Sequence, residues 1–505
     1  MPPRFLLLYN QFPYDYRNIE EITGDLQRVS GMGFNAVWIN PIQKTEIDMH
    51  PVSWLKGEYT ETARKHHLTP IFDLVLNQVA SDSVLCKAHP AWFKPSIHFG
   101  KGCLDFNYDN GAIEAEIITF WRRYIEKYIF VYGFMGIRVD AVKHVPPRVQ
   151  HILYEYIRER CRVRHDTDPI IFAELLLSPS EARKGRLPKF IRELLDLGVT
   201  HITHVINTAY WNIAVDSKVI EFFHDMGTRS NLAPTIGFAG SHDEKTLYGH
   251  VLQGYANHLV SSGSAEVGIS NEDRVHDIMR SYLYENYGPV REILEMMMKK
   301  SLAKVAFGSN GGWYLQSGDE FGAPGVCDEH SFVRGASGLP DHGCRKLVFR
   351  IDDRFRVRGL SQRHWDGIYD LTIFVKLINK VYRDYLSEVS HWVELLEVAS
   401  IPSIIGFVRH PREGFEGGAK LILVNIMERR EELDLGMTKR LIGESGLQAP
   451  TKSFLLGRLT DGDPLVFLVG NFSKRDDINA VVVSLGDGPS TSALDAGSRM
   501  TMDRT

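Results

Sequence analysis

The chain has 505 residues, more than a single hydrophobic core usually holds, so two or more domains are expected. Its 58 basic and 63 acidic residues leave a net charge of −5, which gives no electrostatic reason to expect binding to nucleic acid or to an anionic membrane. Five cysteines without a CxxC pair indicate reduced thiols and an intracellular setting. No apolar run reaches the ~20 residues of a membrane span, and the N-terminal run is too short for a signal peptide, so we expect a cytoplasmic protein.

The first part of the chain alternates between strand and helix patterns. Phe5 to Tyr9 is a continuous apolar run, as expected for a strand buried on both faces. The spacing of apolar residues predicts a helix from Ile19 to Met32, followed by a second strand from Asn35 to Ile39. A short helix from Thr60 to His67 and a strand from Ile71 to Leu76 repeat the rhythm. Strands that alternate with helices predict a parallel sheet.

The segment from Val79 to Glu114 shows no clear helix. A loop of this length inside a compact domain is usually functional. Its neighbouring aromatic residues Trp92 and Phe93 have two equally good explanations. They stack on the ring of a ligand, or they fill a small core within the loop itself.

The next segment carries a strand with two opposite charges on one face. An amphipathic helix is predicted from Glu116 to Phe130, and an alternating strand covers Ile137 to Ala141. Arg138 and Asp140 fall on the same side of that strand, so the guanidinium favours the ionised form of the carboxylate. An ionised, oriented carboxylate is what a covalent catalyst requires. Taken alone, the pattern is explained better by a structural ion pair at a strand end, since ion pairs also arise for structural reasons.

Further strand and helix patterns alternate as far as Leu386. The predicted strands are Ile170–Ala173, His201–Ile206, Pro234–Ala239 and Gly312–Gln316. The predicted helices are Pro146–Arg164, Phe190–Leu197, Ser217–Met226, Val290–Ala306 and Ile368–Leu386. Eight strands that alternate with helices predict an α/β protein with a (β/α)8 TIM barrel. In such barrels the active site lies at the C-terminal ends of the strands. Asp140, Glu174 and Asp243 all come at such ends.

From about Ser390 the pattern changes to short apolar runs separated by Gly and Asp turns, with no helix pattern between them. The runs are Ser403–Val408, Lys420–Val424, Ser453–Leu456, Leu465–Val469 and Ala480–Val483. This organisation predicts a small antiparallel β-sandwich. We therefore expect a barrel domain over residues 1–388, with an excursion at 78–115 after the third strand, and a C-terminal all-β sandwich domain over residues 389–505.

Four motifs in order give the chain a family resemblance. Gly136 to His144 resembles the second signature of the α-amylase superfamily, glycoside hydrolase family 13. Asp73 to Asn77 resembles the first signature, Phe172 to Glu174 the third, and Phe238 to Asp243 the fourth. Leu104 to Asn107 resembles the short auxiliary motif between the first and second. The resemblance implies a barrel with a small domain B at the position of the excursion.

The resemblance assigns roles to the carboxylates. It implies that Asp140 is the nucleophile, that Glu174 is the general acid and base, and that Asp243 stabilises the transition state. It also implies that His242 donates a hydrogen bond to the sugar ring. Glycosidic cleavage requires one ionised and one protonated carboxyl group, and the apolar residues before Glu174 favour its protonated form by partial burial. Taken singly, Glu174 is more simply a turn residue, and His242-Asp243 an N-cap.

Other family positions are also occupied. Arg138 is implied to bind substrate beside the nucleophile, and Asp73 is expected to support it by a hydrogen bond. Lys143 and His144 match positions that line the acceptor side of the cleft.

Two positions bear on substrate and metal. Where the family usually has histidine after the asparagine of its first signature, this chain has Gln78, whose amide is able to donate to a sugar but carries no charge. Asn77 matches a position that contacts Ca²⁺ in many family members, yet calcium takes 6–8 ligands, so we expect no cofactor or metal. The short segment from Gln43 to Gly57 offers no clear equivalent of the tyrosine and aspartate that shape the sugar pocket in the family.

These observations favour a retaining glycoside hydrolase that cleaves α-1,4-glucosidic bonds of an α-glucan or maltooligosaccharide through a covalent glycosyl-Asp140 intermediate. The first alternative is a transglycosylase that passes the sugar to another sugar. The second is a non-catalytic glycan-binding member of the family, suggested by Gln78 and the short loop. The sequence leaves the oligomeric state open.

Overall fold

The structure is a computed structural model that describes part of the chain. The described residues are 5–11, 16, 19–40, 57–96, 103–165, 168–175, 187–203, 234–240, 246–262, 278, 289–322, 369–386 and eight C-terminal strands between 392 and 483. The predicted helix Ser217–Met226 lies outside these ranges, as do His242 and Asp243.

Eight parallel strands close into a barrel, which confirms the predicted fold class. In order around the barrel they are β1 (Leu6–Gln11), β2 (Ala36–Ile39), β3 (Thr69–Leu74), β7 (Gly136–Val139), β8 (Ile170–Ala173), β9 (His201–Thr203), β10 (Thr235–Gly237) and β11 (Gly312–Gln316). Strand β11 pairs with β1 and closes the ring. The predicted strands all fall on these elements, because strands buried on both faces read as continuous apolar runs.

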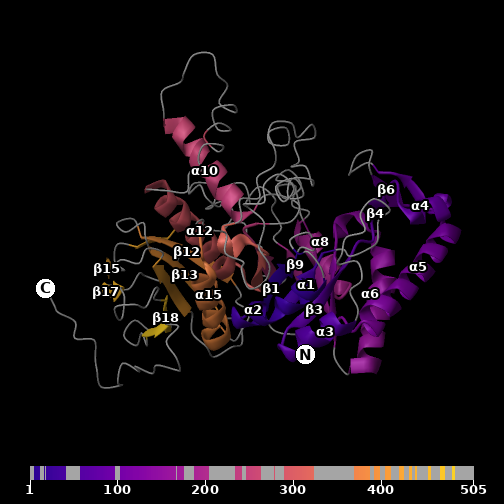
Figure 1. The fold of residues 1–505 in the computed structure, drawn as a ribbon, viewed down its shortest axis with the longest axis horizontal. Helices are drawn as coiled ribbons and strands as arrows, with labels where there is room; N and C mark the ends of the chain where they lie inside the picture. Colours follow the sequence, from indigo (N-terminus) through magenta and orange to yellow (C-terminus); the bar gives the residue numbers. More distant parts are fainter. Residues whose placement is uncertain are drawn as a thin grey trace, which may run out of the picture.

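Helices follow the strands and cover the outside of the barrel (Figure 1). They are α1 (Ile19–Gly24), α2 (Leu26–Gly31), α3 (Gly57–Lys65), α5 (Gly111–Ile125), α6 (Pro147–His165), α8 (Leu187–Asp196), α10 (Leu247–Ser262), α12 (Pro289–Gly308) and α15 (Thr372–Tyr385). The single helix predicted from Ile19 to Met32 is wrong in one respect, since it is two short helices divided at Asp25. Helix α5 continues as a π-helical turn from Glu126 to Val131. Within the described ranges, no helix combines the length and apolar character that crossing a membrane would require.

The barrel interior changes from apolar to polar along the strands. Alternate residues such as Leu6 and Leu8 point inward and form a core cluster with Trp38, Phe172 and Tyr314. A second and larger apolar cluster fills the space between strands and helices. Because the inner cluster fills the lower barrel, the candidate site is sought at the C-terminal ends of the strands, where barrel enzymes place their active sites.

The excursion after β3 is a small folded unit. Strands β4 (Gln78–Ala80), β6 (Cys103–Phe106) and β5 (Phe93–Pro95) form an antiparallel sheet in that order, and a short helix α4 (Val84–Ala88) corrects the prediction that no helix is present. Its beginning is set by a local cap, since the Ser83 hydroxyl accepts a hydrogen bond from the Cys86 N–H. In Figure 1 this unit lies beside α5.

The two aromatic residues of the excursion fill its own core. Trp92 is buried, stacks on His89 with ring centroids 3.9 Å apart, and donates from Nε1 to Glu116 Oε2 at 2.8 Å. The ring of Phe93 packs on that of Phe106 at 4.9 Å. Of the two explanations for these rings, packing within the excursion is therefore the one that the structure supports.

The described residues of the C-terminal part are all in β-strands, in agreement with the all-β prediction. Six strands form an antiparallel sheet in the order β16 (Thr438–Arg440), β12 (Trp392–Val398), β13 (Ile404–His410), β14 (Lys420–Asn425), β18 (Phe467–Asn471) and β19 (Ala480–Val483). Strands β15 (Glu431–Asp434) and β17 (Ser453–Leu456) pair separately. The analysis of the sequence missed β12, β15 and β16.

One arginine joins this sheet to the barrel helices. Arg409 of β13 is buried and donates from Nη1 to the carbonyl oxygens of Phe307 and Ser309, each at 2.8 Å. Its guanidinium also lies 5.4 Å from the ring centre of Tyr382 on α15. These carbonyls belong to the C-terminal end of α12, where a cation complements the helix dipole.

Candidate active site

The site forms where β7 and β8 end side by side. The two strands pair in register as far as Val139 and Ala173, so Asp140 and Glu174 follow at the same level of the barrel. Backbone hydrogen bonds fix both residues: the Asp140 N–H donates to the Leu74 carbonyl at 3.1 Å, and the Glu174 N–H donates to the Val139 carbonyl at 2.9 Å. The structure therefore brings together these two residues, which the sequence placed at separate strand ends.

Arg138 lies at the centre of three carboxylates. Its Nη1 is 3.0 Å from Asp73 Oδ1 and 2.5 Å from Asp140 Oδ1, and its Nη2 is 2.5 Å from Glu174 Oε1. The side chains of Arg138 and Asp73 are 1% and 0% exposed, whereas those of Asp140 and Glu174 are 15% and 12% exposed. Only the latter two carboxylates thus retain a face that a ligand is able to approach.

Asp73 supports the arginine from below, as the sequence predicted. It accepts hydrogen bonds from Arg138 Nη1 and, at 3.0 Å, from Trp38 Nε1. The Arg138 guanidinium also lies over the Trp38 ring, 4.8 Å from its centre. Burial raises the pKa of Asp73 to about 7, although Arg138 opposes the shift. The Asp73 carboxyl group therefore titrates near neutral pH while it is in contact with Arg138.

A strained turn follows the candidate nucleophile. Ala141 has φ 41° and ψ 47°, the left-handed region that residues other than glycine rarely adopt. In this conformation its N–H donates to Glu174 Oε2 at 3.1 Å. The strand predicted to reach Ala141 accordingly ends at Val139. Non-glycine residues in this region cluster at functional sites. Here the left-handed conformation of Ala141, the residue after Asp140, directs its N–H at the carboxylate of Glu174.

Three other residues predicted to bind substrate fall within the described part of the chain. Lys143 and His144 are half-buried in a 3-10 turn, Val142–His144, that directly follows Asp140. Gln78 is half-buried in β4, opposite Asp105 of β6. His242 and Asp243 lie outside the described residues, so their predicted roles remain predictions.

A calcium ion has weak support from the described residues. The side-chain oxygens Asn77 Oδ1, Gln78 Oε1 and Asp105 Oδ1 are buried and have no hydrogen-bond partner. They are oxygen donors of the kind that Ca²⁺ prefers, but they are fewer than the 6–8 ligands it takes. Among the residues that the structure describes, no cluster of three His, Cys, Asp or Glu side chains is suited to a metal.

Three amide residues at the same end of the barrel were missed by the sequence analysis. Asn10 of β1 pairs in register with Gln316 of β11, and its Nδ2 donates to Asn40 Oδ1 at 2.9 Å. All three side chains are buried, and four of their polar atoms have no hydrogen-bond partner in the described structure: Asn10 Oδ1, Asn40 Nδ2, Gln316 Nε2 and Gln316 Oε1. The sequence did contain a signal for these residues. In β1 the inward-facing positions are Leu6, Leu8 and Asn10, so an amide follows two apolar residues on the same face of the strand.

A buried histidine makes the stability of the barrel depend on pH. His201 of β9 lies with Nδ1 3.0 Å from Thr200 Oγ1, and its Nε2 has no hydrogen-bond partner among the described residues. Burial lowers the pKa of His201 from 6.5 to about 4. The unfolded chain takes up this proton near pH 6.5 and the folded chain only near pH 4, so acid favours unfolding across that interval.

We therefore expect the His201→Gln variant to lose less stability in acid than the wild type. Between pH 7 and pH 4.5 the wild type should lose about 2–3 kcal/mol more than the variant. Melting temperatures of both proteins across this range measure the difference, and the opposite contribution of Asp73 cancels because both proteins contain it. Parallel melting curves for the two proteins would show that His201 does not titrate in this way.

Comparison with known proteins shows a likeness in fold. No protein-family model matches the chain, and no curated protein matches its sequence. The solved structures that superimpose on it define its class: it has the fold of α-amylases. An α-amylase from Geobacillus thermoleovorans in complex with acarbose matches with a TM-score of 0.54 at 15% identity, over 95% of this chain and 96% of its own. An Anoxybacillus α-amylase matches with a TM-score of 0.54 at 15% identity, over 95% of this chain and 97% of its own. A MutB mutant in complex with the substrate sucrose matches with a TM-score of 0.55 at 13% identity, over 90% of this chain and 97% of its own.

Proposed function

We propose that this protein is a retaining glycoside hydrolase that cleaves α-1,4-glucosidic bonds in an α-glucan or maltooligosaccharide. The observation that carries the proposal is the pair Asp140 and Glu174, both held on the guanidinium of Arg138 and both partly exposed at the open end of the barrel. Retaining enzymes use two carboxyl groups ~5–5.5 Å apart, and the shared guanidinium holds Asp140 and Glu174 close to one another. The α-amylase fold and the bound acarbose and sucrose of its structural neighbours support a carbohydrate substrate.

The reaction divides into two displacements at the anomeric carbon. In the first, an Asp140 oxygen attacks this carbon while Glu174 gives its proton to the departing glycosidic oxygen. In the second, the Glu174 carboxylate takes a proton from water, and the resulting hydroxide displaces Asp140. Arg138 keeps Asp140 oriented, because its Nη1 binds both Asp140 and the buried Asp73.

Maltoheptaose tests the proposal directly. Purified protein should convert it to shorter sugars, and proton NMR of the first products should show the α-anomer before mutarotation. Longer products as well would indicate transfer to a second sugar, and the β-anomer would indicate inversion. No product from a broad panel of α-glucans would contradict the proposal and favour a binding protein.

The missed amides contribute to sugar recognition in this proposal. Neutral amides pair with vicinal hydroxyls, since each offers a donor and an acceptor, whereas a buried amide without a partner costs ~1–3 kcal/mol. Gln316→Met removes both unpartnered atoms at similar volume. We expect this variant to melt at a higher temperature than the wild type and to bind maltoheptaose about tenfold more weakly by calorimetry.

The binding measurement is best made with Asp140→Asn in both proteins, so that no sugar is consumed. Asn257→Leu, at an exposed position of α10, serves as the control amide and should leave sugar binding unchanged. A Gln316→Met variant that melts lower and binds sugar as well as its parent would show that the amide is structural.

A further inference from the structure

A tryptophan lies directly against the arginine of the candidate active site. Trp38 belongs to the inner cluster of the barrel, on β2, and is 1% exposed. Two other buried rings, Phe172 and Tyr314, make T-shaped contacts with it, at ring-centroid distances of 6.2 and 5.5 Å. Aromatic pairs prefer such edge-to-face geometry, so these neighbours fix the orientation of the indole.

The indole contacts the ion-pair cluster in two ways. Its ring centre lies 4.8 Å from Cζ of Arg138, and a cation over the face of an indole is attracted by the π-electrons. Its N–H donates to Asp73 Oδ2 at 3.0 Å, an oxygen that also accepts from Arg138 Nη1 at 3.2 Å. Since Asp73 and Arg138 are partners in register on β3 and β7, one side chain supports both members of this buried ion pair.

The indole N–H also acts on the charge of Asp73. An indole nitrogen only donates, so it binds the ionised carboxylate more strongly than the neutral acid. Burial raises the pKa of Asp73 to about 7; Arg138 opposes the rise, Asp140 adds to it, and the Trp38 hydrogen bond also opposes it. Loss of the N–H would therefore raise the pKa of Asp73 further. A neutral Asp73 holds the guanidinium less firmly, because its hydrogen bonds from Arg138 are no longer between opposite charges.

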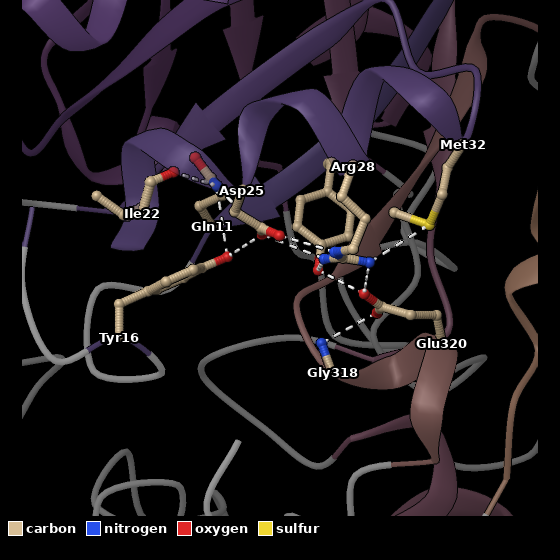
Figure 2. Close-up of polar contacts among 9 residues, drawn as sticks. Gln11, Tyr16, Ile22, Asp25, Arg28, Met32, Gly318 and Glu320 are labelled. Atoms are coloured by element: carbon tan, nitrogen blue, oxygen red, sulfur yellow. Dashed lines mark hydrogen bonds and ion pairs between the residues drawn. The ribbon is translucent and has the colours of Figure 1, made fainter. Parts of the chain in front are cut away.

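A second arginine cluster, between the strands and the helices, provides a comparison. Figure 2 shows Arg28 between Asp25 and Glu320, and its nitrogens lie 2.7 Å from an oxygen of each. An aromatic donor serves this cluster too, because Tyr9 Oη donates to Glu320 Oε1 at 2.7 Å. Both carboxylates are 0% exposed, so neither offers a face to a ligand. Tyr9 is therefore a matched control for Trp38: each is a buried aromatic residue that donates to a buried carboxylate paired with an arginine.

We propose that Trp38 is a positioning residue, which holds the guanidinium of Arg138 at the angle that presents Asp140 and Glu174 to the sugar. This inference rests on the proposed function, because it assigns those two carboxylates to the glycosidase reaction. Arg138 binds Asp140 through Nη1 and Glu174 through Nη2, so a tilt of the planar group away from the indole displaces both carboxylates together. A displacement of about 1 Å in such groups reduces the rate by up to about 10²-fold.

The test compares three variants in assays on maltoheptaose. Trp38→Phe removes the N–H but keeps a ring beside Arg138, so it should lower kcat about tenfold while KM changes less than about threefold. The acid limb of its kcat profile should move to higher pH by about one unit, the worth of one hydrogen bond to a charged group. Trp38→Leu removes the ring as well and should lower kcat about 100-fold. Tyr9→Phe should lower the melting temperature, because Glu320 loses a donor, yet keep kcat within about twofold and the pH profile unchanged.

Melting temperatures report on the indole–carboxylate contact without reference to activity. The unfolded chain releases the Asp73 proton near pH 3.8 and the folded chain near pH 7, so the folded state loses stability as the pH rises through that interval. Trp38→Phe extends the interval to higher pH, and its loss of stability relative to the wild type should therefore be greater at pH 9 than at pH 6. In the Asp73→Asn background, where this position no longer titrates, the loss should be equal at the two pH values.

The outcomes separate the positioning role from the function on which it rests. The proposal is overturned if Trp38→Phe keeps either the kcat or the acid limb of the wild type, or if Tyr9→Phe alters both in the same way. A stability loss for Trp38→Phe that is the same at pH 6 and pH 9 would refute the contact with Asp73. A wild type that is inactive on every α-glucan would refute the proposed function, and the positioning role with it, while the melting experiment still reports on the contact.

Discussion

Replacement of Asp140 by asparagine is expected to lower the rate of maltoheptaose cleavage by at least about 10⁴-fold, because it removes the nucleophile of a covalent mechanism. Folding should survive, since the asparagine oxygen still accepts from Arg138 Nη1. The measurement is product release followed by chromatography, with circular dichroism to establish that the variant is folded. Mass spectrometry of wild type quenched during turnover should also locate a hexosyl-containing adduct on the peptide that carries Asp140.

Asp109→Asn is the matched control, because Asp109 is an exposed aspartate that pairs with Lys94 outside the barrel. Its activity should equal that of the wild type. If Asp140→Asn retains more than about a hundredth of the wild-type rate, or if the adduct maps to another residue, then Asp140 is not the nucleophile.

Replacement of Arg138 by methionine is expected to affect both stability and activity. Three carboxylates would then lie together without their cation, and breaking a buried ion pair in this way costs about 3–5 kcal/mol. The loss should be smaller at pH 5 than at pH 8, since protonation of the carboxylates relieves their repulsion. Melting temperature against pH measures this effect, and activity should fall to background because Asp140 loses the contact that orients it.

Arg162→Met provides the comparison for Arg138, because Arg162 forms an exposed pair with Asp168 that is worth about 0–1 kcal/mol. Arg138→Lys keeps the charge but is unable to contact three carboxylates with planar geometry, so it should fall between wild type and Arg138→Met. A loss for Arg138→Met no larger than that for Arg162→Met, or independent of pH, would contradict the central role of the arginine.

The barrel strands were predictable because a strand covered on both faces must be apolar along its length, and Ile170–Ala173 and Gly312–Gln316 matched the structure residue for residue. The turn after Asp140 was not predictable in the same way. The alternation of Arg138, Asp140 and their neighbours continues through Ala141, yet the chain leaves the sheet there in a left-handed conformation. Nothing in an alanine signals a positive φ, so only the contact of its N–H with Glu174 explains it.

Long-range contacts account for the other differences. The helix predicted from Ile19 to Met32 divides at Asp25, a residue whose carboxylate binds Arg28, which in turn binds Glu320 almost 300 residues away. The amides Asn10 and Gln316 are neighbours only because the first and last strands close the barrel. Local patterns reveal which residues face inward, but they contain no information about which distant strand comes to lie beside them.

The contact between Arg409 and the end of α12 has a consequence for engineering. A chain cut between residues 388 and 389 would lose the donor that serves the carbonyl oxygens of Phe307 and Ser309, and the ring of Tyr382 would lose its cation. Buried acceptors without donors cost ~1–3 kcal/mol each. A truncated barrel, or a chimera with a foreign C-terminal sheet, would therefore need an arginine at the equivalent place. Without one, water would have to reach the carbonyl oxygens at the C-terminal end of α12.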